Sequence, residues 1–267
     1  MSGVPFASSH ASDAAVLAVI PARLGATRLP RKPLRLLGGA PIVTRVWERV
    51  VESRVAQRVV VATDSDEVAA VLRERGAEVA MTRADHPSGT DRVAEVAERP
   101  EYRAYGIVVN VQGDEPFVRT DAIDAAVVMV TGRGFAIGTC ATAAPREILG
   151  NPDIVKVVCD DAGRALYFSR APIPWLRVDG ADGERRDALV RQHVGLYACT
   201  RVALQRWVAL PMHDLERVER LEQLRPLAAG MAIGVAVVAP GPLGGIDTED
   251  DLTRANALWD DLYAGRP

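Results

Sequence analysis

Four cationic side chains occupy one proline- and glycine-rich stretch near the start of the chain. This stretch follows an apolar run over residues 14–20, which reads as a strand, and its prolines make residues 22–32 a predicted loop. Loops after the strands of α/β sheets are where these sheets bind ligands. Guanidinium and ammonium groups suit phosphate oxygens. The stretch therefore predicts a polyphosphate site, with these candidate cations: Arg23, Arg28, Arg31 and Lys32.

A carboxylate follows a second apolar run. Residues 106–111 read as a buried strand, and the segment NVQGDEP at 110–116 places Asp114 just after it. Asp114 is then expected at the same sheet edge as the cationic loop. Mg²⁺ takes one or two carboxylates together with phosphate oxygens and water, so Asp114 is the leading candidate metal ligand. A solvated turn is the alternative for this motif in isolation, and its pairing with the cationic loop favours the ligand.

A second carboxylate, Asp247, stands between the glycine-rich segment 241–245 and a helix expected over residues 248–263. It fits a second metal ligand. Position alone fits a helix cap equally well.

The segment 81–92 is polar, rich in turn residues and preceded by a predicted strand. Ser88 and the backbone around it are candidates for reading the edge of a nucleobase, and Arg83 is a candidate contact to phosphate or base. An exposed loop capped by Thr90 is the alternative.

Several apolar segments in the second half carry polar side chains that suit an acidic, hydroxylated small molecule. Arg170 can pair with a carboxylate, and Glu222 and Gln223 can bond hydroxyls. His193 and Tyr197, taken singly, are more typical of satisfied core residues. The chain has no Walker loop, no GxSxG or GxGxxG motif and no zinc-ligand spacing.

Composition indicates a globular protein with a local, not a global, cationic site. The chain has 267 residues, 48% of them hydrophobic, with a net charge of -3 and a pI near 5.9, which argues against nucleic-acid and membrane partners. Its apolar runs are too short to cross a bilayer. Residues 1–13 lack a secretion signal and are predicted to be a flexible leader of a cytoplasmic protein. Three cysteines are predicted to be reduced and buried: Cys140, Cys159 and Cys199.

Alternating β-rich and amphipathic helical runs between residues 14 and 130 predict a doubly wound α/β fold with a mostly parallel sheet. We predict a single domain over residues 14–267, with an antiparallel insertion at about 160–230. The expected strands are 14–20, 58–62, 78–81, 106–111, 154–159, 164–168, 192–199 and 231–238, of which 154–159 and 164–168 form a hairpin. The expected helices are 41–52, 64–75, 91–99, 120–130, 215–229 and 248–263, and residues 171–189 are expected to be a long exposed loop.

A series of motifs in this order closely resembles the 3-deoxy-manno-octulosonate cytidylyltransferases. They are PAR at 21–23, TRLP at 27–30, KPL at 32–34, ATD at 62–64, SGTDR at 88–92, NVQGDEP at 110–116, ALYFSRAPIP at 165–174 and LEQLR at 221–225. The resemblance covers nearly everything from residue 16 to 259, and ordered motifs are far more specific than any one of them. The chain departs from the usual pattern at Arg31, where a glycine is common, at Ala40, where a lysine is common, and in its longer leader.

The resemblance implies a Rossmann-like nucleotidyltransferase fold and transfer of CMP from CTP to the anomeric hydroxyl of 3-deoxy-D-manno-octulosonate (Kdo). The sugar oxygen would attack the α-phosphate directly with help from Mg²⁺, releasing pyrophosphate and giving CMP-Kdo for lipopolysaccharide synthesis. A homodimer is also implied, with the insertion supplying the interface and sugar contacts. The alternatives are a cytidylyltransferase for another acidic sugar and a non-catalytic nucleotide-binding relative, and retention of Lys32, Asp114 and Asp247 argues against the latter.

Site residues carried over by this resemblance form four sets. The catalytic set is Arg23, Lys32 and Asp114, and the Mg²⁺ ligands are Asp114 and Asp247. The CTP set is Ala22, Arg23, Arg28, Lys32, Arg83, Ser88 and Gln112. The Kdo set is Gln112, Arg170, His193, Tyr197, Glu222 and Gln223.

Overall fold

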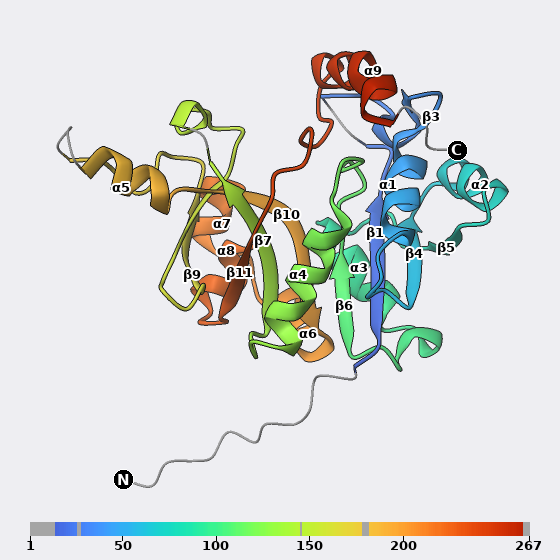
Figure 1. Cartoon of the computed structure of the whole chain (residues 1–267). Helices are drawn as coiled ribbons and strands as arrows, with labels where there is room; N and C mark the ends of the chain where they lie inside the picture. Colours follow the sequence, from blue (N-terminus) through green and yellow to red (C-terminus); the bar gives the residue numbers. More distant parts are fainter. Residues whose placement is uncertain (1–13, 26–27, 145, 178–181, 264–267) are drawn as a thin grey trace, which may run out of the picture.

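A mixed sheet runs through the molecule (Figure 1). The computed structural model describes residues 14–25, 28–144, 146–177 and 182–263, and within them the sheet has nine strands. The main path has the order β11-β7-β10-β6-β1-β4-β5, and β8 joins β9 to β10. The strands are β1 (Val16–Ala22), β4 (Arg58–Thr63), β5 (Glu78–Met81), β6 (Ile107–Asn110), β7 (Ile137–Ala143), β8 (Lys156–Cys159), β9 (Ala165–Ser169), β10 (Arg191–Thr200) and β11 (Ile233–Val238).

Helices cover both faces of this sheet. Successive side chains of β1 alternate between two cores, with Ala18 and Ile20 in one and Leu17 and Val19 in the other. The first core is covered by α1 (Ile42–Val51), α2 (Asp66–Glu74), α4 (Thr120–Thr131) and α9 (Glu249–Tyr263), and the second by α3 (Gly89–Ala97), α6 (Arg201–Ala209) and α8 (Leu224–Ala228). The predicted doubly wound, mostly parallel fold is confirmed.

Strand direction brings the ends of β1 and β6 together. The two strands are parallel, with Val19 opposite Asn110, and Val111 continues the pairing by donating its N–H to the Val19 carbonyl at 3.1 Å. β10 is antiparallel to both β6 and β7. The loops that follow β1 and β6 therefore leave the sheet side by side, as the sequence predicts.

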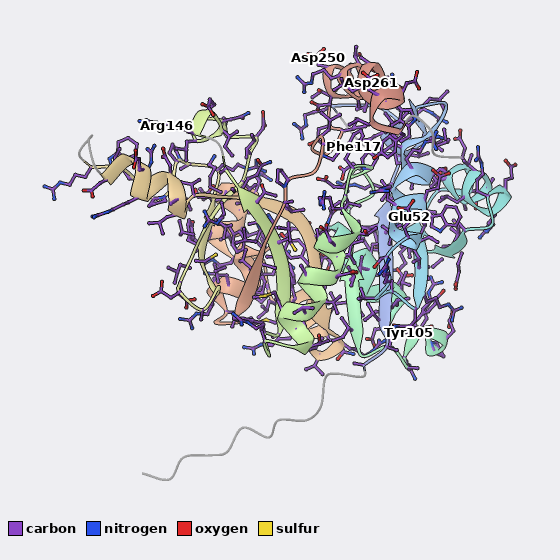
Figure 2. All side chains as sticks on the ribbon, in the orientation of Figure 1. Glu52, Tyr105, Phe117, Arg146, Asp250 and Asp261 are labelled. Carbon is purple, nitrogen blue, oxygen red and sulfur yellow. The ribbon has the colours of Figure 1, made fainter. Side chains whose placement is uncertain are left out.

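Aromatic packing ties the loop after β6 to the last helix. Phe117, labelled in Figure 2, lies 6.2 Å from the Trp259 ring and 6.4 Å from the Tyr263 ring, measured between centroids. A small hairpin of β2 (Leu36–Leu37) and β3 (Ala40–Pro41) contacts the same helix. The C-terminal helix α9 thus packs against the loop after β6 and the β2–β3 hairpin, both from the first half of the chain.

The predicted antiparallel hairpin is present, since β8 and β9 pair with Val157 opposite Phe168. Residues 171–189 were wrongly predicted as loop throughout, because residues 182–189 form α5 (Asp182–Leu189), which projects away from the sheet (Figure 1). Its acidic first turn is favourable at a helix N-terminus, but its high charge content resembles loop composition. The predicted leader over residues 1–13 lies outside the described residues.

A single helix over 215–229 was also wrong. Arg220 adopts a left-handed conformation with φ of 56°, which ends α7 (Asp214–Glu219) before α8 begins at Leu224. β7 and α6 were not predicted. None of the helices in the described part of the chain has the length and apolar character needed to cross a membrane.

Candidate active site

A cavity of about 400 Å³ opens where the loops after β1 and β6 meet the N-terminus of α3. Most of the predicted phosphate and nucleotide residues reach it from different parts of the chain. Its lining is formed by Pro21, Ala22, Arg23, Gly25, Arg28, Leu29, Lys32, Pro33, His86, Pro87, Ser88, Gly89, Arg92, Gln112, Gly113, Asp114, Glu222 and Asp247.

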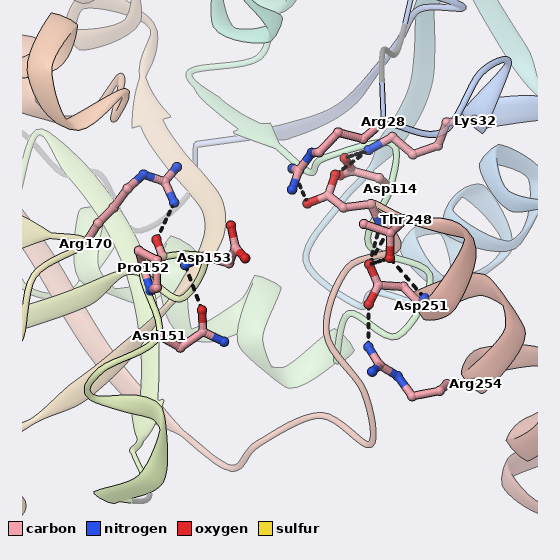
Figure 3. Close-up of polar contacts among 11 residues, drawn as sticks. Arg28, Lys32, Asp114, Asn151, Pro152, Asp153, Arg170, Thr248, Asp251 and Arg254 are labelled. Atoms are coloured by element: carbon pink, nitrogen blue, oxygen red, sulfur yellow. Dashed lines mark hydrogen bonds and ion pairs between the residues drawn. The ribbon is translucent and has the colours of Figure 1, made fainter.

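The ammonium group of Lys32 bridges the two predicted metal ligands. Its Nζ donates to Asp114 Oδ2 at 2.6 Å and to Asp247 Oδ1 at 2.8 Å, and Arg28 Nη2 lies 3.0 Å from Asp247 Oδ2 (Figure 3). Burial opposes the charge on Lys32, but the two carboxylates outweigh it and raise the lysine pKa. Two carboxylates and two cations thus meet at one end of the cavity.

The local backbone explains how Lys32 reaches this point. Arg31 has φ of 57°, in the left-handed region that favours glycine, and it precedes the short 3-10 helix η1 (Lys32–Leu34). The Arg31 side chain is exposed and pairs with Glu67 on the surface. Arg31 therefore turns the chain so that Lys32 points inward, and its own charge faces away from the cavity.

Close backbone contact fixes Asp114 beside the end of β1. A Cβ at Gly113 would lie 2.5 Å from the Pro21 carbonyl oxygen, so a side chain cannot be placed there without moving the backbone. The Asp114 carbonyl accepts the Ile246 N–H at 2.9 Å, which ties in the segment that carries Asp247. Three distant segments are thereby locked around the Lys32 ammonium.

Glu115, next to this cluster, was not predicted as a site residue. Burial, together with the charges of Asp114 and Asp247, raises the pKa of Glu115 to about 8. The sequence signal for Glu115 is its place beside Asp114, in an adjacent acid pair directly after a buried strand.

The carboxylates of Asp114 and Asp247 fit a magnesium ion. Both are hard oxygen donors, and they already share one cation, the Lys32 ammonium. Within the described residues, no group of three or more His, Cys, Asp or Glu side chains is arranged to hold a metal. Mg²⁺ here would therefore draw its other ligands from phosphate oxygens and water.

The α3 side of the cavity carries the predicted nucleobase loop. Ser88 lines the cavity and caps α3, because its Oγ accepts the Asp91 N–H at 3.2 Å and donates to Asp91 Oδ2 at 2.6 Å. His86 also lines the cavity and contacts Glu95. No sequence pattern indicated that His86 would lie in the cavity wall. Arg83 does not line it and pairs instead with Asp85 at 3.5 Å, with 70% of its side chain exposed.

A polar chain links Gln112 to Glu222, the two predicted sugar residues that line the cavity. Gln112 Nε2 donates to Asn110 Oδ1 at 3.4 Å, and Asn110 Nδ2 donates to Thr90 Oγ1 at 3.4 Å. Thr90 Oγ1 donates to Glu222 Oε2 at 2.7 Å. Burial raises the pKa of Glu222. The sequence suggested Thr90 only as a helix cap, and Asn110 was part of the NVQGDEP motif without a predicted role of its own.

The other predicted sugar residues lie outside the cavity lining. His193 packs between the rings of Phe168 and Tyr197, at centroid distances of 5.0 and 5.5 Å, and its Nε2 is 2.9 Å from Thr139 Oγ1. Burial lowers the pKa of His193 to about 3, so the ring is neutral. Tyr197 and Gln223 are buried. Arg170 lies at the end of β9 and donates from Nη1 to the Pro152 carbonyl at 2.9 Å (Figure 3).

Comparison with known proteins gives the family. A family model described as cytidylyltransferase matches residues 17–233. The chain belongs to the cytidylyltransferase family. This cytidylyltransferase is 62% identical over 249 residues to 3-deoxy-manno-octulosonate cytidylyltransferase of Gemmatimonas aurantiaca, covering 93% of the chain and 96% of that protein. It is 47% identical over 242 residues to the protein of the same name from Leptothrix cholodnii, covering 88% of each.

Solved structures agree with this assignment. A structure described as CMP:2-keto-3-deoxy-manno-octonic acid synthetase complexed with CTP matches with a TM-score of 0.85 and 37% identity, covering 93% of this chain and 99% of that one. A 4-diphosphocytidyl-2C-methyl-D-erythritol synthase from Anaerococcus prevotii, 14% identical, matches with a TM-score of 0.62, covers 92% of this chain and 99% of that one, and shares the fold. The resemblance inferred from the sequence motifs is confirmed.

Proposed function

We propose that this cytidylyltransferase transfers CMP from CTP to the anomeric hydroxyl of Kdo and releases pyrophosphate. The observation that carries the proposal is the Lys32 bridge between Asp114 and Asp247, inside a cavity that Arg23 and Arg28 also line. The names of the relatives at 62% and 47% identity and of the CTP-bound structure support the same reaction.

The reaction needs positioning and charge compensation more than covalent chemistry by the protein. The sugar oxygen forms a bond to the α-phosphorus while the bond from that phosphorus to the pyrophosphate oxygen breaks. Negative charge grows on the departing pyrophosphate, and Arg23, Arg28 and Lys32 supply donors at the cavity wall to compensate it. A protein nucleophile is not required.

Asp114 and Asp247 would hold Mg²⁺ in this scheme. When bound, Mg²⁺ neutralises phosphate charge and orients the phosphate oxygens. The two carboxylates otherwise face the cations Lys32 and Arg28, and these cations keep the acidic pair compensated in the structure described here.

Nucleotide and sugar would occupy neighbouring parts of the site. Ser88 and the backbone around it would face the cytosine, while Gln112 and Glu222 would bond sugar hydroxyls from the cavity wall. Figure 3 shows the Arg170 guanidinium pointing toward the side of the site that holds Arg28 and Asp114. Arg170 would pair with the Kdo carboxylate. His193, Tyr197 and Gln223 stay candidate sugar residues, although none of them lines the cavity.

We also propose a cytoplasmic homodimer that supplies CMP-Kdo for lipopolysaccharide synthesis. The insertion exposes large apolar side chains, with Trp175 78% and Leu189 59% exposed, beside the projecting helix α5. Exposed patches of this kind mark association surfaces. Light scattering should give twice the chain mass, and Trp175→Glu should reduce it to one chain. A monomeric wild type would contradict the dimer.

Thermal stabilisation by nucleotides tests the proposed donor. With Mg²⁺ present, CTP should raise the melting temperature more than ATP, GTP or UTP, because a ligand that binds the native state stabilises it according to its affinity. Equal stabilisation by UTP or GTP would contradict a cytidylyltransferase. Turnover with sialic acid in place of Kdo would instead assign a different acidic sugar.

A further inference from the structure

A buried lysine that the proposed reaction does not use lies behind Arg170. Lys156, the first residue of β8, is 0% exposed. Its Nζ donates to the carbonyls of Asn151 at 2.9 Å, of Ile154 at 2.7 Å and of Arg170. An ammonium group has three N–H donors, so all of them are used on backbone oxygens.

Arg170 is held from its other sides by Glu219. The Glu219 carboxylate accepts the backbone N–H of Arg170 at 2.9 Å and the Ser169 hydroxyl at 2.6 Å. The backbone carbonyl of Glu219 accepts from Arg170 Nε at 2.9 Å. Arg170 Nη1 donates to the Pro152 carbonyl, which belongs to the turn that Lys156 pins through Asn151 and Ile154. The backbone and guanidinium of Arg170 are therefore both fixed.

This arrangement leaves one donor group of Arg170 available. Among the described residues, Arg170 Nη2 has no hydrogen-bond acceptor, and the guanidinium points toward the side that holds Arg28 and Asp114 (Figure 3). A cation held in place before binding loses little conformational freedom when an anion arrives. A fixed guanidinium with a free edge fits a carboxylate.

We propose that Lys156, together with Glu219, is a positioning residue that orients Arg170 to receive the carboxylate of the acidic sugar. The inference rests on the proposed function, because it takes Kdo as the acceptor. Lys156 touches neither substrate: it acts through the Arg170 carbonyl and through the turn that carries Pro152.

Lys156→Met tests this role, since methionine fills a similar volume without donors. Losing charge-assisted hydrogen bonds that orient Arg170 should raise the KM for Kdo about 10- to 100-fold. The KM for CTP should stay within about twofold of wild type, because the nucleotide side of the cavity is untouched. An equal rise in both KM values would overturn the proposal.

Arg201→Met is the matched control. Arg201 also donates to backbone carbonyls, those of Ala97, Tyr102 and Tyr105, but it lies at the opposite end of the strands, beside the start of β6. This variant should lower the melting temperature while leaving both KM values unchanged. If it raises the KM for Kdo as much as Lys156→Met does, the effect is general destabilisation and the proposal fails.

Kdo amide, which lacks the negative charge, separates positioning from other effects. In wild type the amide should bind about 10- to 100-fold more weakly than Kdo, and Lys156→Met should add little to that loss. If Lys156→Met weakens binding of the amide as much as it weakens binding of Kdo, Lys156 does not act through the carboxylate. Equal binding of Kdo and its amide by wild type would also overturn the inference. These four affinities, of wild type and variant for Kdo and its amide, form a thermodynamic cycle. If Lys156→Met does not fold, Glu219→Gln takes its place in this cycle.

The wild-type enzyme distinguishes the two levels of inference. If wild type releases no pyrophosphate with Kdo, the proposed function fails and this inference fails with it. If wild type uses Kdo but the cycle shows no coupling, the proposed function stands and the role of Lys156 is refuted.

Discussion

Replacing Asp114 with asparagine should separate stability from turnover. In the native structure Lys32 donates to two carboxylates, Asp114 at 2.6 Å and Asp247 at 2.8 Å. Asp114→Asn leaves Asp247 in place and keeps a neutral oxygen that can still accept from Lys32. The ammonium is therefore not left unpaired, and the free energy of unfolding should fall by about 1 kcal/mol.

The expected melting temperature is correspondingly close to that of wild type. For a chain of this size, about 1 kcal/mol corresponds to a shift of about 2–4 °C, measurable by circular dichroism. Turnover should fall much further, by about 100-fold or more, which is the scale for losing one electrostatic contact to a phosphoryl-like transition state. Pyrophosphate release from CTP in the presence of Kdo and Mg²⁺ measures it.

Asp121→Asn provides the control for this variant. Asp121 is an exposed carboxylate at the start of α4 that pairs with Arg119 at 2.6 Å, away from the cavity lining. Its turnover should equal that of wild type. Turnover of Asp114→Asn within tenfold of this control would remove Asp114 from the catalytic centre.

Three further perturbations follow from packing and burial. Gly113→Ala should lower turnover and cost about 1–3 kcal/mol of stability, because its methyl would meet the Pro21 carbonyl at 2.5 Å, whereas Gly150→Ala, where nothing lies within 4 Å, should be neutral in activity assays and melts. The pKa of His193 is about 3 in the native state and about 6.5 in the unfolded chain. Below pH 6.5 the unfolded chain therefore binds the extra proton, and the free energy of unfolding decreases by up to about 1.4 kcal/mol for each unit by which the pH is lowered. His193→Gln should remove that slope in urea titrations at pH 7 and pH 5, and an unchanged slope would refute the buried neutral ring. Burial raises the pKa of Cys140 to about 12, so its thiol should react with a disulfide reagent at pH 8 only after unfolding.

The site was predictable where it depends on strand order and direction. Parallel strands end at one edge, so a cation after β1 and a carboxylate after β6 must meet, whatever the details of the loops. Asp247 was ambiguous because a helix start suits a cap as well as a ligand. The structure shows it contacting Lys32, while Asp251 accepts the Asp247 N–H at 3.1 Å.

The sugar side was less predictable because it depends on irregular geometry. The pairing of β10 with β7 shifts register between Val194 and Tyr197, and this shift sets which residues of β7 stand opposite His193 and Tyr197. Alternation along the sequence cannot locate such a shift. The orientation of the Arg170 guanidinium likewise depends on a hydrogen bond to the Pro152 carbonyl, 18 residues earlier in the chain.

β7 was not predicted because its small residues are set by close packing against α4. A Cβ at Gly138 would lie 2.1 Å from the Ala126 carbonyl, so α4 packs directly on this strand and requires small residues there. Such residues carry little strand propensity of their own. The strand forms because β10 and β11 pair with it on either side.

Pyrophosphate release by the purified enzyme, with identification of the sugar nucleotide formed, tests the central claim most directly. With Mg²⁺, CTP and Kdo together, pyrophosphate and CMP-Kdo should appear in equal amounts, and omission of Kdo should abolish both. Equal release with UTP, release without a sugar, or turnover of sialic acid but not Kdo would contradict the account.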